Sequence, residues 1–102
     1  MSINNINDSA GSMITDPAKR ITSNILSKYE VSAILAKRAR DLETGSKYDP
    51  RVLQFIPAEN ISNITIAETE LKYGLIPYYI YREVGDNIYE RWSVSEMYYR
   101  AD

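Results

Sequence analysis

The side chains that could carry out acid–base chemistry in this chain are carboxylates, lysines and tyrosines, because the sequence has no histidine and no cysteine. This composition excludes Ser-His-Asp triads, thiol nucleophiles, disulfides and zinc fingers. A hydrolase would need two carboxylates held in one pocket. Four glutamates of the second half are scattered over the elements predicted below: Glu68, Glu70, Glu90 and Glu96. We therefore expect a non-catalytic protein with no metal and no cofactor.

Tyrosines gather near the C-terminus, at positions 78, 79, 81 and 89. They could form a stacking platform for single-stranded nucleic acid. However, the cations beside them are Arg82 and Arg91, whereas Glu83, Asp86 and Glu90 would repel phosphate. The net charge of −2 also gives no long-range attraction to nucleic acid. Core packing and a protein interface are favoured, and a free-standing nucleic-acid-binding module is the alternative.

A first helix is predicted from Ser27 to Leu42. Ser27 followed by Glu30 is a capping box, in which each residue bonds the other's backbone N–H. An apolar stripe follows at three- and four-residue spacing: Val31, Ile34, Leu35, Ala39 and Leu42. Ala33 and Ala36 leave a shallow surface that another backbone could approach closely. We expect a docking helix, with Lys37 and Arg40 as surface charge.

The segments on either side of this helix have weaker patterns. Residues 1–22 are polar and aperiodic, which predicts a disordered N-terminal tail ahead of a domain over residues 23–102. In the connector over residues 43–61, the run from Val52 to Ile56 predicts a short strand or an extended segment. The N-terminus does not resemble a signal peptide, and no apolar stretch is long enough to cross a bilayer, so we expect an intracellular protein.

A second helix is predicted from Ser62 or Asn63 to Tyr73. Its buried stripe would be Ile64, Ala67 and Leu71. Gly74 would form the left-handed stop.

A β-hairpin is predicted next, because the apolar period changes to two over residues 76–82 and 88–92. With a three-residue loop of Gly85, Asp86 and Asn87, three pairs meet across the strands: Val84 with Ile88, Arg82 with Glu90, and Ile80 with Trp92. Trp92 is expected in the core. Ser93 and Glu96 predict a short terminal helix that carries Met97 toward the core. The fold class is α+β: two helices, then a C-terminal antiparallel hairpin and a short terminal helix.

Two blocks of residues together resemble a known family. The first is Ser27-Lys28-Tyr29-Glu30 followed by Arg38-Ala39. The second contains Ile66-Ala67, Glu70-Leu71, Ile76-Pro77, Ile80, Arg82, Asp86, Glu90 and Trp92. In this order and spacing they resemble the omega family of RNA polymerase subunits, in particular its archaeal and eukaryotic branch, the sixth small subunit common to the nuclear polymerases.

The departures from this pattern indicate a divergent member, such as one encoded by a large DNA virus. Ser27 replaces the usual threonine, which costs nothing at a helix N-cap. Gly85 and Asn87 replace the proline and glycine of the family's turn, and Ser62-Asn63 stands where the family has Asp-Pro. The connector between the blocks is longer than usual.

The resemblance implies a non-catalytic subunit of a DNA-dependent RNA polymerase that clasps the largest subunit and supports its assembly and stability. Other polymerase subunits are then further partners, without strong direct nucleic-acid binding and without a membrane. The implied partner-binding residues are Lys28, Tyr29, Glu30, Arg38, Ala39 and Arg82. Arg38 is expected to be solvated in the free chain and buried by the partner. The location would be the nucleus for a cellular eukaryotic member, and the host cytoplasm or virion for a viral one.

Overall fold

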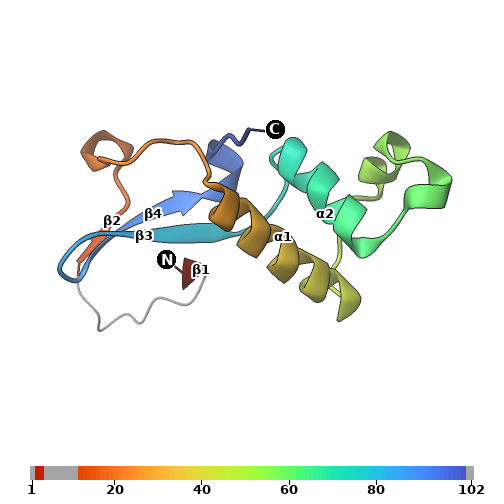
Figure 1. Ribbon diagram of the computed structural model, residues 1–102, viewed down its shortest axis with the longest axis horizontal. Helices are drawn as coiled ribbons and strands as arrows, with labels where there is room; N and C mark the ends of the chain where they lie inside the picture. Colours follow the sequence, from red (N-terminus) through yellow and green to blue (C-terminus); the bar gives the residue numbers. More distant parts are fainter. Residues whose placement is uncertain (1, 4–11, 101–102) are drawn as a thin grey trace. The chain divides into compact units, whose positions relative to one another are not determined.

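Helix α1 (Lys28–Glu43) begins where the sequence predicts, in a computed structural model that describes residues 2–3 and 12–100 (Figure 1). The Glu30 N–H donates to Ser27 Oγ over 3.1 Å, and the Ser27 N–H donates to Glu30 Oε1 over 2.8 Å. The capping box is therefore confirmed. The buried residues of α1 recur every four positions: Glu30, Ile34, Arg38 and Leu42. Two polar residues thus belong to a face that the apolar pattern assigns to hydrophobic side chains alone.

The connector after α1 is helical, so the prediction of a strand or an extended segment over Val52–Ile56 is wrong. Two 3₁₀ helices occur there, Pro50–Phe55 and Ala58–Asn60. Asp49 accepts a hydrogen bond from the Arg51 N–H over 2.9 Å, and Pro50 fixes a backbone angle suited to a helix start. This turn directs Val52 into an apolar cluster with residues of both long helices: Leu42, Val52, Ile56, Ile66 and Ala67.

Helix α2 (Asn63–Lys72) follows, with Ser62 as its N-cap and Gly74 in the left-handed conformation at φ 69°, as predicted. The predicted stripe is wrong at Ile64, whose side chain is 44% exposed. The residues that α2 buries are Ile66, Ala67, Glu70 and Leu71. Glu70 turns inward to meet Arg38 of α1, and this rotation leaves Ile64 outside.

Strands β3 (Tyr79–Gly85) and β4 (Ile88–Ser93) form the predicted hairpin. Ile80 pairs with Trp92 and Arg82 with Glu90, as expected. The pairing of Val84 with Ile88 is wrong, because Gly85 is the partner of Ile88 and a bulge lies between Glu83 and Gly85. Asn87 adopts a positive φ of 55°, which asparagine tolerates better than most residues, so the turn needs fewer residues than predicted.

The N-terminal segment adds strands to both edges of this hairpin. β2 (Ser12–Ile14) pairs in parallel with β4, and β1 (Ser2–Ile3) pairs antiparallel with β3, giving the order β1-β3-β4-β2. A 3₁₀ turn, Pro17–Lys19, follows β2. The prediction of disorder is therefore wrong for residues 12–22, because a polar segment can still find backbone partners at a strand edge. Residues 1 and 4–11 of the predicted tail lie outside the described residues, and the domain boundary at residue 23 stays a prediction.

These elements divide into two compact units. One unit is Ser27–Ile76, with α1, α2 and the 3₁₀ helices. The other joins the segment up to Leu26 with the segment from Pro77 onward, and therefore holds the sheet. It ends with the predicted terminal helix, a 3₁₀ turn over Val94–Glu96, after which Met97 is buried. The α+β class is confirmed. In the described ranges, no helix is both long and apolar enough to cross a membrane.

Candidate partner-binding residues

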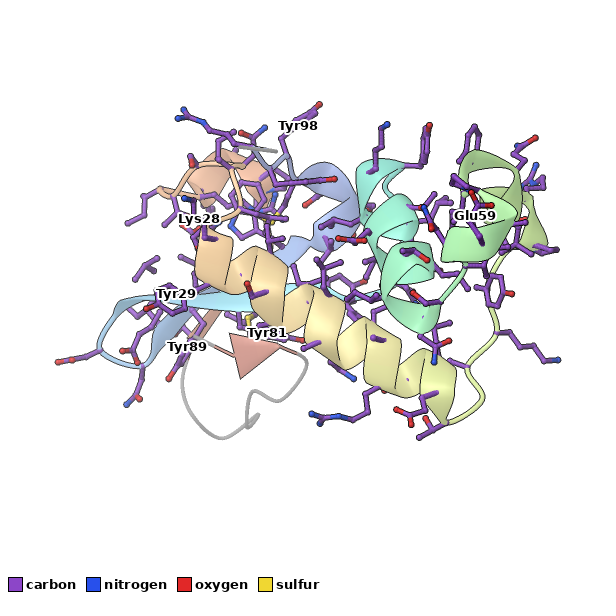
Figure 2. The ribbon with its side chains drawn as sticks, turned by 45° about the vertical axis from the view of Figure 1, so that its right-hand side comes forward. Lys28, Tyr29, Glu59, Tyr81, Tyr89 and Tyr98 are labelled. Atoms are coloured by element: carbon purple, nitrogen blue, oxygen red, sulfur yellow. The ribbon has the colours of Figure 1, made fainter. Side chains whose placement is uncertain are left out.

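The first turn of α1 presents an aromatic side chain to solvent. Tyr29 is 85% exposed, the largest value among the large hydrophobic side chains that the structure describes, and Lys28 beside it is also exposed. Figure 2 shows both side chains projecting away from the helix. Glu30 instead is buried, because its carboxylate closes the capping box. The capped first turn of α1 therefore holds an exposed tyrosine at a fixed position on the helix.

The same outward face continues along α1 with small residues. The exposed positions after the first turn are Ser32, Ala33, Ala36, Arg40 and Glu43. Ala39 is half-buried at the flank of this face. Lys37 is also half-buried, and its Nζ lies 3.1 Å from Asp41 Oδ2. The exposure of Arg40 agrees with its prediction as surface charge.

Arg38 lies on the opposite, buried face of α1. Its Nε donates to Glu70 Oε1 over 2.8 Å and its NH2 donates to Glu70 Oε2 over 2.7 Å. The same NH2 group donates to the Lys47 carbonyl over 3.1 Å. The Arg38 residue is only 4% exposed, so the prediction that it is solvated in the free chain is wrong. The Glu70 carboxylate of α2 accepts the hydrogen bonds that the prediction assigned to acceptors of another protein. A role for Arg38 in binding a partner protein stays a prediction.

Arg82 is also bonded within its own unit. Its NH1 donates to Thr22 Oγ1 over 2.9 Å and to the Ser23 carbonyl over 2.5 Å, and its NH2 donates to the Ile25 carbonyl over 2.9 Å. A single guanidinium thus fixes the chain that leads toward α1. Its contact with a partner protein likewise stays a prediction.

Glu90, opposite Arg82, has no exposed surface. Its carboxylate accepts hydrogen bonds from the Ile21 N–H at 2.5 Å, the Thr22 N–H at 3.2 Å and the Trp92 Nε1–H at 2.9 Å, and a short one from the Thr22 hydroxyl. Burial acts to raise the pKa of Glu90, but these hydrogen bonds outweigh it and hold the pKa below its usual value. The surrounding hydrogen-bond donors therefore stabilise the ionised form of the Glu90 carboxylate.

Trp92 is 7% exposed, which confirms its prediction as a core residue. Two guanidinium groups lie over its ring, Arg20 at 3.9 Å and Arg82 at 5.6 Å from the centroid. Arg20 also donates to the Arg91 carbonyl over 2.9 Å and lies 3.1 Å from the Glu96 carboxylate. These contacts attach the segment after β2 to the C-terminal half of the chain.

The tyrosines of the hairpin do not share one exposed face. Tyr78 is 7% exposed, whereas Tyr79 is 43% exposed and carries the Arg91 guanidinium 4.5 Å from its ring centroid. Tyr81 and Tyr89 are half-buried. A hydrogen bond to Glu83 raises the pKa of Tyr89, which therefore stays a neutral donor. The four rings together do not offer the continuous stacking platform that the nucleic-acid alternative needs.

Sequence reasoning gave no role in these contacts to Arg20, Thr22 or Glu70, and for Glu90 it predicted only the cross-strand pairing with Arg82. A signal existed for two of them, because Glu70 and Glu90 belong to the same family-like blocks as Arg38 and Arg82. The structure shows that each arginine of those blocks has its acid close by, as an ion pair for Arg38 and as a cross-strand neighbour for Arg82. No comparable signal marks Arg20 or Thr22.

The sequence also matches a protein-family model. The model of the family described as RNA polymerase Rpb6 matches residues 20–78, which is more than half of the chain. The matched region begins at Arg20 and includes both Arg38 and Glu70. The chain therefore belongs to the RNA polymerase Rpb6 family and is a non-catalytic subunit of RNA polymerase.

Proposed function

We propose that this subunit binds the largest subunit of a DNA-dependent RNA polymerase through the outward face of α1, and that this contact supports assembly and stability of the enzyme. The observation that carries the proposal is Tyr29, an aromatic ring 85% exposed on a capped helix end in a member of a polymerase-subunit family. Tyrosine is enriched where proteins contact each other, because its ring buries apolar area while its hydroxyl keeps a polar partner.

The other predicted residues have separate parts in this proposal. Lys28 and Ala39 contact the partner beside Tyr29, and the small side chains of Ala33 and Ala36 let its backbone approach α1 closely. Glu30, Arg38 and Arg82 act from within the chain. Their hydrogen bonds fix the helix start, the helix pair and the segment before α1.

The proposed location and lineage follow from the same family membership. We place the protein inside the cell, where RNA polymerase works: in the nucleus for a cellular eukaryotic member, and in the host cytoplasm or virion for a viral one. Its place in the archaeal and eukaryotic branch, and a viral origin, stay predictions.

The decisive experiment is recovery of the largest subunit by a tagged, full-length chain after nuclease treatment. Tyr29→Ala should weaken that association by about 2 kcal/mol, the scale of a central interface residue. Its melting temperature should stay near the wild-type value, because the ring is exposed in the free chain. Tyr98→Ala is the matched control, since Tyr98 is 65% exposed on the other unit.

The outcomes separate the candidate functions. Loss of the large subunit with Tyr29→Ala but not with Tyr98→Ala supports the proposal. Equal recovery by all three proteins contradicts the assignment of the α1 face. Recovery of polymerase only when nucleic acid is left intact would favour the nucleic-acid-binding alternative.

A further inference from the structure

Residues 20–25, called the strap here, cross the hairpin without burying an apolar side chain. Ile21 is 76% exposed and Ile25 is 40% exposed, and Ser23 and Asn24 are exposed as well. The hydrophobic effect therefore contributes little to holding this segment in place. Its attachment must come from polar contacts.

Most of those polar contacts converge on two side chains of the hairpin, while Arg20 donates to the Arg91 carbonyl and the Asn24 carbonyl accepts from the Tyr98 N–H. Glu90 accepts the Ile21 and Thr22 N–H groups and the Thr22 hydroxyl, and Arg82 donates to the Ser23 and Ile25 carbonyls. The bonded atoms of the strap are mostly backbone atoms. Loss of one hairpin side chain would therefore release several strap bonds together.

Separate contacts fix the chain on both sides of the strap. Before it, β2 pairs with β4 at Ser12 and Ile14. At its end, the Tyr98 N–H donates to the Asn24 carbonyl over 2.9 Å, the Leu26 N–H donates to the Tyr98 carbonyl over 2.7 Å, and Leu26 is buried. The strap can therefore lift between two anchors while β3 and β4 keep their own ladder.

We infer that the strap is a latch: it opens locally, without unfolding of the hairpin, and the charged Glu90 carboxylate holds it closed. Segments with few buried apolar contacts are the ones that open at low free-energy cost. Opening uncovers the face of Trp92 that Arg20 covers at 3.9 Å. It also frees Glu90 and Arg82 to bond the main chain of another extended segment. This inference does not rest on the α1 face.

Amide hydrogen exchange of the ¹⁵N-labelled full-length chain tests the latch. In the wild type, the Ile21 and Thr22 amides should exchange faster than the ladder amides of β3 and β4. Glu90→Gln should speed exchange at both strap amides by about tenfold or more, since it removes charge-assisted acceptors. Ladder amides of β3 should change by much less. Glu83→Gln, on the same hairpin, is the matched control and should leave the strap amides unchanged.

A second variant keeps the test valid if the Glu90→Gln protein fails to fold. Thr22→Val removes one hydroxyl from the strap itself and leaves the hairpin sequence intact. It should raise strap exchange and the quenching of Trp92 by acrylamide, and Trp92 is the chain's single tryptophan. Thr15→Val is the control for the substitution. Strap and ladder amides that exchange at one common rate in the wild type, or a Thr22→Val protein with unchanged strap exchange and quenching, would overturn the latch.

Discussion

Arg38 of α1 and Glu70 of α2 form a buried, bidentate ion pair, with Nε–Oε1 and NH2–Oε2 distances of 2.8 and 2.7 Å. Both side chains are nearly inaccessible, at 5% and 3% exposure. The forked geometry uses two nitrogens of a planar guanidinium, which a lysine could not reproduce. The pair therefore fixes the rotation of one helix against the other within their unit.

Arg38→Ala should destabilise the free protein, because it leaves the Glu70 carboxylate buried without its charge partner. Removal of one member of a buried pair typically costs about 3–5 kcal/mol. The free energy of unfolding from urea titration measures the loss. Arg40→Ala is the control, because Arg40 is exposed on the same helix, and it should change stability by less than about 0.5 kcal/mol. A stable Arg38→Ala protein would restore the expectation of a solvated arginine.

Replacement of both partners should cost less than replacement of either one. Arg38→Met with Glu70→Leu removes both buried charges and fills their space with apolar atoms, an exchange that is often neutral in protein cores. The double variant should therefore unfold at higher urea concentration than Arg38→Met alone. If the double variant is less stable than Arg38→Met alone and Glu70→Leu alone, the ion pair stabilises the fold by more than each charge offsets the burial cost of the other.

Acidification should weaken the unit that holds the sheet through Glu90. Its pKa is below the usual 4.5 in the folded protein, so the ionised group stabilises the fold above its unfolded pKa. That stability is lost as the pH falls through the folded-state pKa. Glu90→Gln should flatten the pH dependence of the unfolding free energy below about pH 5. Glu59→Gln, at an exposed position, controls for the loss of one negative charge. Parallel pH profiles of both variants and the wild type would refute the assignment.

The left-handed conformation of Asn87 should be visible in the stability of turn variants. With φ at 55°, Asn87→Ala should destabilise the protein by about 1 kcal/mol, because a Cβ without a compensating polar group is strained there. Asn87→Gly should be tolerated without loss, since glycine adopts positive φ freely. Asp86→Ala, in the same turn, is the control. Equal denaturation midpoints for Asn87→Ala and Asn87→Gly would argue against this turn geometry.

Deletion of residues 1–19 should lower the melting temperature by several degrees. The deletion removes β2 and its pairing with β4, as well as the 3₁₀ turn before Arg20. A change of about 1 kcal/mol shifts the melting temperature of a chain this size by about 4–8 °C. A truncated protein with the wild-type melting temperature would mean that this segment is the dispensable tail that its composition suggests.

Local signals in the sequence were sufficient for much of the fold. The capping box at Ser27, the stop at Gly74 and the pairing of Ile80 with Trp92 depend on neighbouring residues or on a short turn, and all three agree with the structure. Such features follow from backbone chemistry that a few residues determine.

Features that depend on distant partners were not predictable in this way. Apolar periodicity treats a polar residue as exposed, so it could not indicate that Arg38 and Glu70 are buried together. The polar segment around Thr22 likewise has no apolar face, and its order comes from Glu90 far along the chain. Ile64 was misassigned for the same reason, because the ion pair sets the rotation of α2.

The chain's connectivity also implies an order of events during synthesis on the ribosome. The unit Ser27–Ile76 is continuous, so all of its contacts are available once Ile76 has left the exit tunnel. β2 precedes this unit in the chain, whereas its partner β4 follows it. β2 must therefore wait, without its partner, until the helical unit and β4 have been translated, and termination before Ile88 would leave it without that partner. Because domains generally fold as units during translation, the helical unit is complete before the sheet can form.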